Sequence, residues 1–181
     1  MKKYIYTFII VFILGAIIYS IYSEINKPKV SIKAKRLECQ KRVTSFERAY
    51  DKEQLIKAQI LLKNGNFIIS HGIDKAKYMD STLFDLIDME KLTSQLKSKL
   101  NKSDKLTKDD IKIDYKVYEN DTEDPKKKSD NCKFFRGYVV MKILNKNNKL
   151  IYQVQIDFMD FEGKDIPATL DCAVKSFLTY K

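Results

Sequence analysis

The sequence predicts an α+β fold, in which an N-terminal transmembrane helix precedes helices packed on a three- to four-stranded antiparallel sheet with a C-terminal helix. The chain opens with a long uncharged run, and apolar residues then recur at helical spacing up to residue 100. From residue 111 apolar and polar residues alternate, which is typical of a strand with one buried face. We therefore divide the chain into a transmembrane anchor (1–23), a basic juxtamembrane linker (24–36) and a single α+β extracytoplasmic domain (37–181).

The opening run fits a membrane-spanning helix. Residues 4–22 carry no charge, and a helix of 19 residues is roughly 28 Å long, close to the ~30 Å hydrocarbon core of a bilayer. A cleaved signal peptide has a shorter apolar core and small residues before the cut, whereas the possible cuts after Ser20 and Ser23 follow bulky residues. We expect a retained anchor, with cleavage of the run as the alternative. Its tyrosines are expected at the two headgroup layers: Tyr4, Tyr6, Tyr19 and Tyr22.

The positive charge is concentrated beside this run. The net charge is +10, of which residues 1–36 contribute +6 and residues 37–181 only +4. The chain has four arginines, and bidentate recognition of phosphates and bases relies on arginine, so we expect no nucleic-acid partner. The basic residues of the linker are expected at the surface of the inner membrane: Lys27, Lys29, Lys33, Lys35 and Arg36.

Two signals disagree about orientation. Counting lysines and arginines on either side of the run places the folded domain in the cytoplasm. An apolar segment that starts at residue four, behind Lys2 and Lys3, is typical of an export signal whose N-terminus stays inside. We favour a single-pass inner-membrane protein with its folded domain in the periplasm, and the cytoplasm-facing arrangement stays open.

The first half of the domain has helical spacing. Apolar residues four, three and four positions apart predict a helix from about residue 37 to 50: Cys39, Val43, Phe46 and Tyr50. Asp51 and Gln54 have the spacing of a capping box, so a second helix begins there. Asn64-Gly65 ends this helix or, alternatively, turns a hairpin. Residues 80–100 predict a third helix, capped by Asp80 or Ser81.

The second half predicts a meander of strands. Residues 111–117 alternate in hydropathy, residues 132–144 form an apolar strand, and residues 150–159 alternate again. A charged loop with Pro125 and a turn at residues 145–148 separate the strands. Pro167 suits the first turn of the closing amphipathic helix.

The three cysteines are widely spaced. If the turn is centred between Lys146 and Asn147, Cys132 faces the chain just before the last helix, close to Cys172. We therefore predict a Cys132–Cys172 disulfide, conditional on an oxidising compartment. Cys39 is left over, either buried on its helix or able to cross-link a dimer.

No catalytic, cofactor or metal site is expected. His71 is adjacent in sequence to Ser70, and such neighbours do not form a triad, so we interpret it as a loop or strand-end histidine. The chain has only five glycines and no glycine-rich phosphate loop. The acids around Gly163 lack the spacing of an EF-hand and are interpreted as a solvated turn: Asp157, Asp160, Glu162 and Asp165.

These features predict a non-enzymatic, membrane-anchored periplasmic protein. We expect a protein-binding subunit or accessory factor of a bacterial cell-envelope assembly of the secretion, pilus or flagellar-motor type. Its partners would be other envelope proteins or further copies of itself, together with the inner membrane. The alternatives are a soluble periplasmic or secreted binding domain released by signal cleavage, and a cytoplasm-facing membrane protein.

Overall fold

The computed structural model describes residue 15 and residues 36–101, 110–126 and 135–181. The chain divides into two compact units, Met1–Ala34 and Lys35–Lys181. Among the described residues, no helix combines the length and the apolar character needed to cross a membrane. The predicted anchor falls almost entirely outside them.

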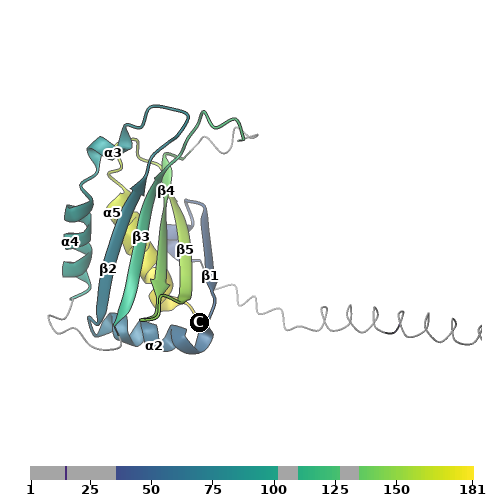
Figure 1. Cartoon of the computed structure of the whole chain (residues 1–181), viewed down its shortest axis with the longest axis vertical. Coiled ribbons are helices and arrows are strands. Elements are labelled where there is room, and N and C mark those ends of the chain that lie inside the picture. Colours follow the sequence, from purple (N-terminus) through teal and green to yellow (C-terminus); the bar gives the residue numbers. More distant parts are fainter. Residues whose placement is uncertain (1–14, 16–35, 102–109, 127–134) are drawn as a thin grey trace, which may run out of the picture. The chain divides into compact units, whose positions relative to one another are not determined.

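The second unit is an α+β domain with one sheet. Its elements are, in chain order, η1 (Glu38–Gln40), β1 (Ser45–Ala49), α2 (Lys52–Lys63), β2 (Phe67–Asp74), α3 (Leu83–Leu86), α4 (Met89–Lys99), β3 (Ile111–Glu119), β4 (Gly137–Leu144), β5 (Leu150–Phe158) and α5 (Ile166–Thr179). Helix α5 crosses one face of the sheet, α4 lies beside β2, and α2 runs under the lower strand ends (Figure 1).

The sheet is larger and more mixed than predicted. It has five strands in the order β1-β5-β4-β3-β2, and β2 pairs with β3 in parallel while the other pairs are antiparallel. The prediction of three or four antiparallel strands was incomplete because β1 and β2 were not recognised. A parallel pair needs a crossover connection, and the segment containing α3 and α4 supplies it.

The helix predicted over residues 37–50 is wrong. The segment forms the short turn η1 and then the edge strand β1, in which Phe46 is 65% exposed and Tyr50, just after it, is 48% exposed. The apolar spacing therefore did not mark a buried face. The inward-facing residues of β1 include Glu47, whose carboxylate accepts hydrogen bonds from the hydroxyls of Tyr152 and Ser176.

The second predicted helix is confirmed as α2. Asp51 caps it, because its carboxylate accepts from the backbone N–H of Gln54 at 3.1 Å and from the side-chain amide of Gln54 at 2.8 Å. Gly65 follows the helix with φ 75°, the left-handed conformation that glycine adopts without strain. The helix-end interpretation of Asn64-Gly65 is therefore correct.

The later elements were largely predicted. The helix expected over residues 80–100 is divided into α3 and α4, because Asp88 starts a new helix by accepting from the backbone N–H of Lys91 at 2.9 Å. The strands β3, β4 and β5 and the closing helix α5 are present. A turn centred between Lys146 and Asn147 would pair Val139 of β4 with Val154 of β5. In the structure Val139 pairs with Ile156, two residues further along β5.

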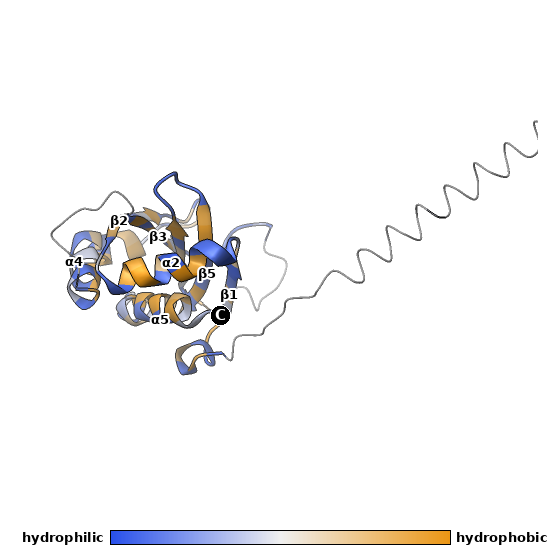
Figure 2. Ribbon diagram, turned by 90° about the horizontal axis from the view of Figure 1, so that it is seen from below, coloured by the Kyte–Doolittle hydropathy of each residue, from blue (hydrophilic) through white to orange (hydrophobic). Residues whose placement is uncertain are grey.

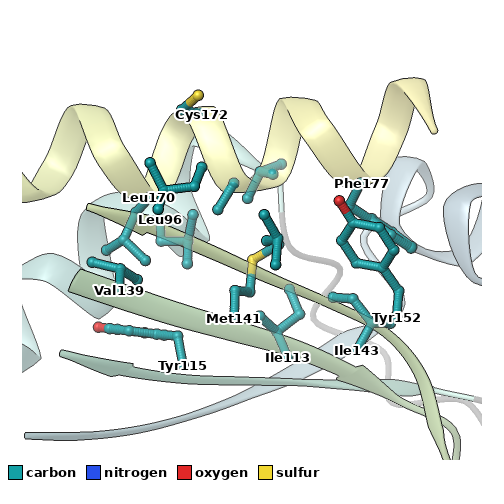
Figure 3. Close-up of a cluster of buried hydrophobic side chains, with 14 of the residues drawn as sticks. Leu96, Ile113, Tyr115, Val139, Met141, Ile143, Tyr152, Leu170, Cys172 and Phe177 are labelled. Carbon is teal, nitrogen blue, oxygen red and sulfur yellow. The ribbon is translucent and has the colours of Figure 1, made fainter. Parts of the chain in front are cut away.

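The core lies between the sheet and α5 (Figure 3). Alternate residues of β3 point into it, among them Ile113 and Tyr115, which are fully buried. Tyr152 of β5 packs against Phe177 of α5 with ring centroids 5.3 Å apart. Hydrophobic residues gather where α2, α5 and the strands meet (Figure 2). Most of the polar residues of the strands alternate with the buried ones and therefore lie on the opposite face of the sheet.

The disulfide has a different partner from the one predicted. Cys172 is bonded to Cys39, with a Cα–Cα separation of 6.0 Å, and Cys132 lies outside the described residues. Cys172 points from α5 away from the sheet (Figure 3), where η1 packs against the helix. The amide of Gln40 also donates to the Ser176 hydroxyl at 2.9 Å. The prediction failed because the residues before β1 fold back onto α5.

Candidate interaction surface

A largely apolar groove lies between α2 and the β4–β5 turn of the described domain. Its volume is about 600 Å³. Apolar side chains line it: Ala58, Ile60, Leu61, Ile111 and Ile151. Its polar lining comes from α2 and from the turn: Gln54, Lys57, Asn145, Lys146 and Asn147. Grooves of this size with apolar walls and a few polar groups are typical binding sites.

The sequence of α2 explains why the groove is open. The residues that bury the helix against the domain are Leu55, Ala58 and Leu62. Ile56 and Ile60 lie outside this stripe and are 62% and 53% exposed. Neither isoleucine is needed for the core, so α2 presents one helix turn of aliphatic surface beside the groove.

Hydrogen bonds fix the turn that forms the opposite wall. The amide of Asn145 donates to Gln54 Oε1 at 2.7 Å, and Asn145 Oδ1 accepts from the backbone N–H groups of Asn147 and Lys149. The Lys149 ammonium lies 3.0 Å from Asp51 Oδ2. The backbone N–H of Gln54 and the charge of Lys149 lower the pKa of Asp51. The groove is therefore preformed, which reduces the entropy lost on binding.

The described lining of the groove consists of aliphatic side chains, amides and two lysines, and it includes no carboxylate, histidine, cysteine or hydroxyl group. Apolar side chains of a bound ligand would remove the aliphatic walls of the groove from water. Lys57, which is exposed on α2, would attract a carboxylate of that ligand.

His71 lies within β2, opposite Tyr115 in the register, and not in a loop or at a strand end as predicted. Its Nδ1 is 2.8 Å from the Thr93 hydroxyl, and its Nε2 is 3.4 Å from a carboxylate oxygen of Glu90. The Tyr115 hydroxyl is also 2.8 Å from that of Thr93, and burial raises the pKa of Tyr115. These contacts join α4 to the outer strand β2, which is a structural role.

The acids around Gly163 organise a turn. Asp160 accepts from the backbone N–H groups of Glu162 and Lys164, and Asp165 accepts from those of Met159 and Asp160. This agrees with the interpretation of the segment as a turn. Asp157 differs because it is buried on β5, and desolvation raises its pKa. Within the described ranges, no group of three or more His, Cys, Asp or Glu residues is placed to hold a metal ion.

A buried ion pair at the opposite end of the sheet was not predicted. Glu119 accepts from Arg136 Nη2 at 2.8 Å and from the backbone N–H groups of Thr82 and Leu83 at 3.3 Å. Burial opposes ionisation, but these hydrogen bonds and the arginine lower the pKa of Glu119 overall. The pair fastens the segment before α3 to the end of β3. Glu119 is the last residue of β3 and Arg136 directly precedes β4, so no local pattern revealed the pair.

The predicted membrane-interface residues are almost all outside the described part of the chain. The exception is Arg36, which is exposed and lines a hollow of about 350 Å³ together with Lys41, Arg42 and the buried Asp157. The groove beside α2 was missed altogether, although the apolar pair Ile56 and Ile60, outside the buried stripe, was a usable signal.

Comparisons of this chain with protein-family models, with curated proteins and with solved structures found no match.

Proposed function

We propose that this chain is a non-enzymatic, membrane-anchored periplasmic protein whose domain binds other proteins. It would serve as a subunit or accessory factor of a bacterial cell-envelope assembly of the secretion, pilus or flagellar-motor type. The observation that carries the proposal is the preformed apolar groove beside α2, with Ile60 53% exposed at its edge. An exposed aliphatic surface of this kind is costly to leave in water and is typical of an interface.

The disulfide supports the proposed compartment. A bond between Cys39 and Cys172 persists in an oxidising environment such as the periplasm and is rare in the bacterial cytosol. It is equally compatible with a soluble domain released by signal cleavage. The intact mass of the protein isolated from membranes distinguishes these two forms.

The groove predicts the chemistry of the partner segment. Aliphatic or aromatic side chains would occupy the space between α2 and the turn, and a carboxylate would lie near Lys57. Because the Gln54–Asn145 contact already fixes the turn, we expect little change in the groove on binding.

The experiment is site-specific photocrosslinking of the full-length protein in native membranes. A photoreactive phenylalanine analogue replaces Ile60, and the matched control replaces Leu86, which is 56% exposed at the other end of the domain. We expect a discrete protein adduct from position 60 alone, and we expect Lys57→Glu to reduce it several-fold while Lys91→Glu leaves it unchanged. Identical adducts from both positions, or no protein adduct from position 60, would refute the proposal.

A further inference from the structure

The exposed side of α2 carries a row of residues with an apolar centre and basic ends. Successive members of the row are four, four and three positions apart, so they lie on one side of the helix: Lys52, Ile56, Ile60 and Lys63. The two isoleucines are 62% and 53% exposed, and both lysines are exposed as well. The row extends along the whole helix, roughly 16 Å. Ile60 also lines the groove, so the row forms one rim of it.

The charge that α2 presents to solvent is mostly positive. Its exposed charged residues are three lysines and one glutamate: Lys52, Lys57, Lys63 and Glu53. Among the described residues, no carboxylate forms an ion pair with any of the three lysines. A partner that brings carboxylates to these positions would therefore gain favourable charge pairs without breaking any that the domain already has.

The backbone groups around the groove are already hydrogen-bonded. Ile111 and Ile151 form its floor, and the strands that contain them, β3 and β5, each lie between two other strands of the sheet. In the turn on the opposite wall, Asn145 Oδ1 accepts from the backbone N–H groups of Asn147 and Lys149. An extended segment in the groove would therefore find no strand edge to pair with, and burying its peptide groups unpaired would cost free energy.

A helix avoids this cost, because its backbone hydrogen bonds are made within the segment itself. We propose that the groove binds an acidic amphipathic helix of another protein, which lies along α2. The inference rests on the proposed function, in which the groove binds a protein, and it specifies the kind of segment that binds.

The row on α2 defines the pattern of this partner helix. Apolar residues three or four positions apart would pack on Ile56 and Ile60 and reach the floor of the groove. Acidic residues at the two ends of the helix would lie near Lys52 and Lys63. Because those lysines are roughly 16 Å apart along the axis, the partner helix needs at least about three turns.

The shape of the site favours a helix over the surface of a lipid bilayer. Ile111 and Ile151 are only 2% and 1% exposed, so the floor of the groove is recessed below the exposed isoleucines of α2. A flat surface resting on Ile56 and Ile60 would leave this recess unfilled, whereas the side chains of a helix project into it. Contact with lipid alone is therefore an outcome that the test must distinguish.

The test maps crosslinks from two positions on the same side of α2. A photoreactive phenylalanine analogue replaces Glu53 or Ile60 in the full-length protein in native membranes, and mass spectrometry identifies the residue of the partner that each one attaches to. The two positions are two helix turns apart, roughly 10 Å. We expect the two attachment sites to lie about seven residues apart in the partner, whereas an extended segment would place them about three apart.

The outcomes separate this inference from the proposed function. Attachment sites about three residues apart would overturn the helix, while the protein adduct from position 60 would still support protein binding at the groove. Attachment to lipid alone would overturn the helix and the protein partner together. The absence of any adduct from position 60 would count against the proposed function, on which the inference rests.

A charge-reversal pair tests the acidic ends of the partner. Lys52→Glu/Lys63→Glu should lower the yield of the protein adduct from position 60 by at least about tenfold, because both ends of the row then repel carboxylates. The matched control, Lys91→Glu/Lys97→Glu, makes the same change of charge on exposed residues of α4 and should leave the yield unchanged. Replacing the acidic residues of the mapped partner segment by lysine should restore the yield. Equal yields from the two double variants would overturn the acidic partner.

Discussion

The Cys39–Cys172 bond should be a large contributor to the stability of the domain. It joins residues 133 positions apart, and the loop-closure entropy removed from the unfolded chain corresponds to about 5 kcal/mol at 25 °C. Cys39→Ala isolates this effect, because Cys39 is exposed and its replacement leaves no cavity in the core. We expect the free energy of unfolding to fall by about 3–5 kcal/mol, since measured losses often lie below the entropic value.

The assay is urea unfolding of the full-length protein in detergent, followed by circular dichroism with and without reductant. Reductant should lower the midpoint of the wild type to that of Cys39→Ala and should leave the variant unchanged. Cys39→Ala/Cys172→Ala should lose little beyond Cys39→Ala, because both substitutions remove the same bond. The small extra loss reflects the buried volume of Cys172, which is 3% exposed.

Cys132→Ala is the matched control, and it should leave the midpoint under oxidising conditions unchanged. The opposite pattern, in which Cys132→Ala is as destabilising as Cys172→Ala and Cys39→Ala has no effect, would refute the pairing. It would support instead the bond predicted from the sequence. Peptide mapping under non-reducing conditions provides an independent measurement.

Three further substitutions test the packing of the sheet. Glu119→Gln leaves the buried Arg136 without its counter-charge and should cost about 3 kcal/mol of unfolding free energy. The lowered pKa of Glu119 means that its contribution is present above pH 4.5 and is lost as pH falls further, so acid titration of stability should be flatter in the variant. Gly137→Ala brings a methyl group against the backbone carbonyl of Tyr118, so we expect no folded protein in expression trials. Tyr152→Phe removes a buried hydrogen bond to Glu47 and should lower stability in urea by about 1–2 kcal/mol.

Elements with a strong local signal were predicted well. The Asp51–Gln54 spacing located the start of α2, because the capping contacts join residues only three positions apart. The alternation from Ile111 to Val117 located β3, because one face of the strand is buried and the other is not. In both cases the residues that determine the structure are neighbours in the sequence.

The two outer strands had no such signal. β1 turns the half-buried Glu47 toward α5 and exposes Phe46, so its apolar residue lies on the solvent face and its charged residue on the inner face. β2 pairs in parallel with β3, and the crossover through α4 separates Phe67 from its partner Ile111 by more than forty residues. Neither strand can be recognised without knowing what packs against it.

The groove could be predicted only in part. Ile56 and Ile60 were visible as an aliphatic pair outside the buried stripe of α2, and they mark an exposed apolar surface. The opposite wall depends on the contact between Gln54 and Asn145, which lie 91 residues apart. That contact exists because α2 runs beneath the strand ends (Figure 1), and this is a property of the assembled fold.

The disulfide and the edge strand are connected through the order of the chain. Cys39 precedes β1, and its partner lies on α5, the helix that covers the sheet. Tension applied from the N-terminal side therefore reaches the core through a covalent bond before it reaches the hydrogen bonds between β1 and β5. An edge strand without such a bond would be the first to separate from the sheet under that tension. The bond thus keeps β1 in place beside β5.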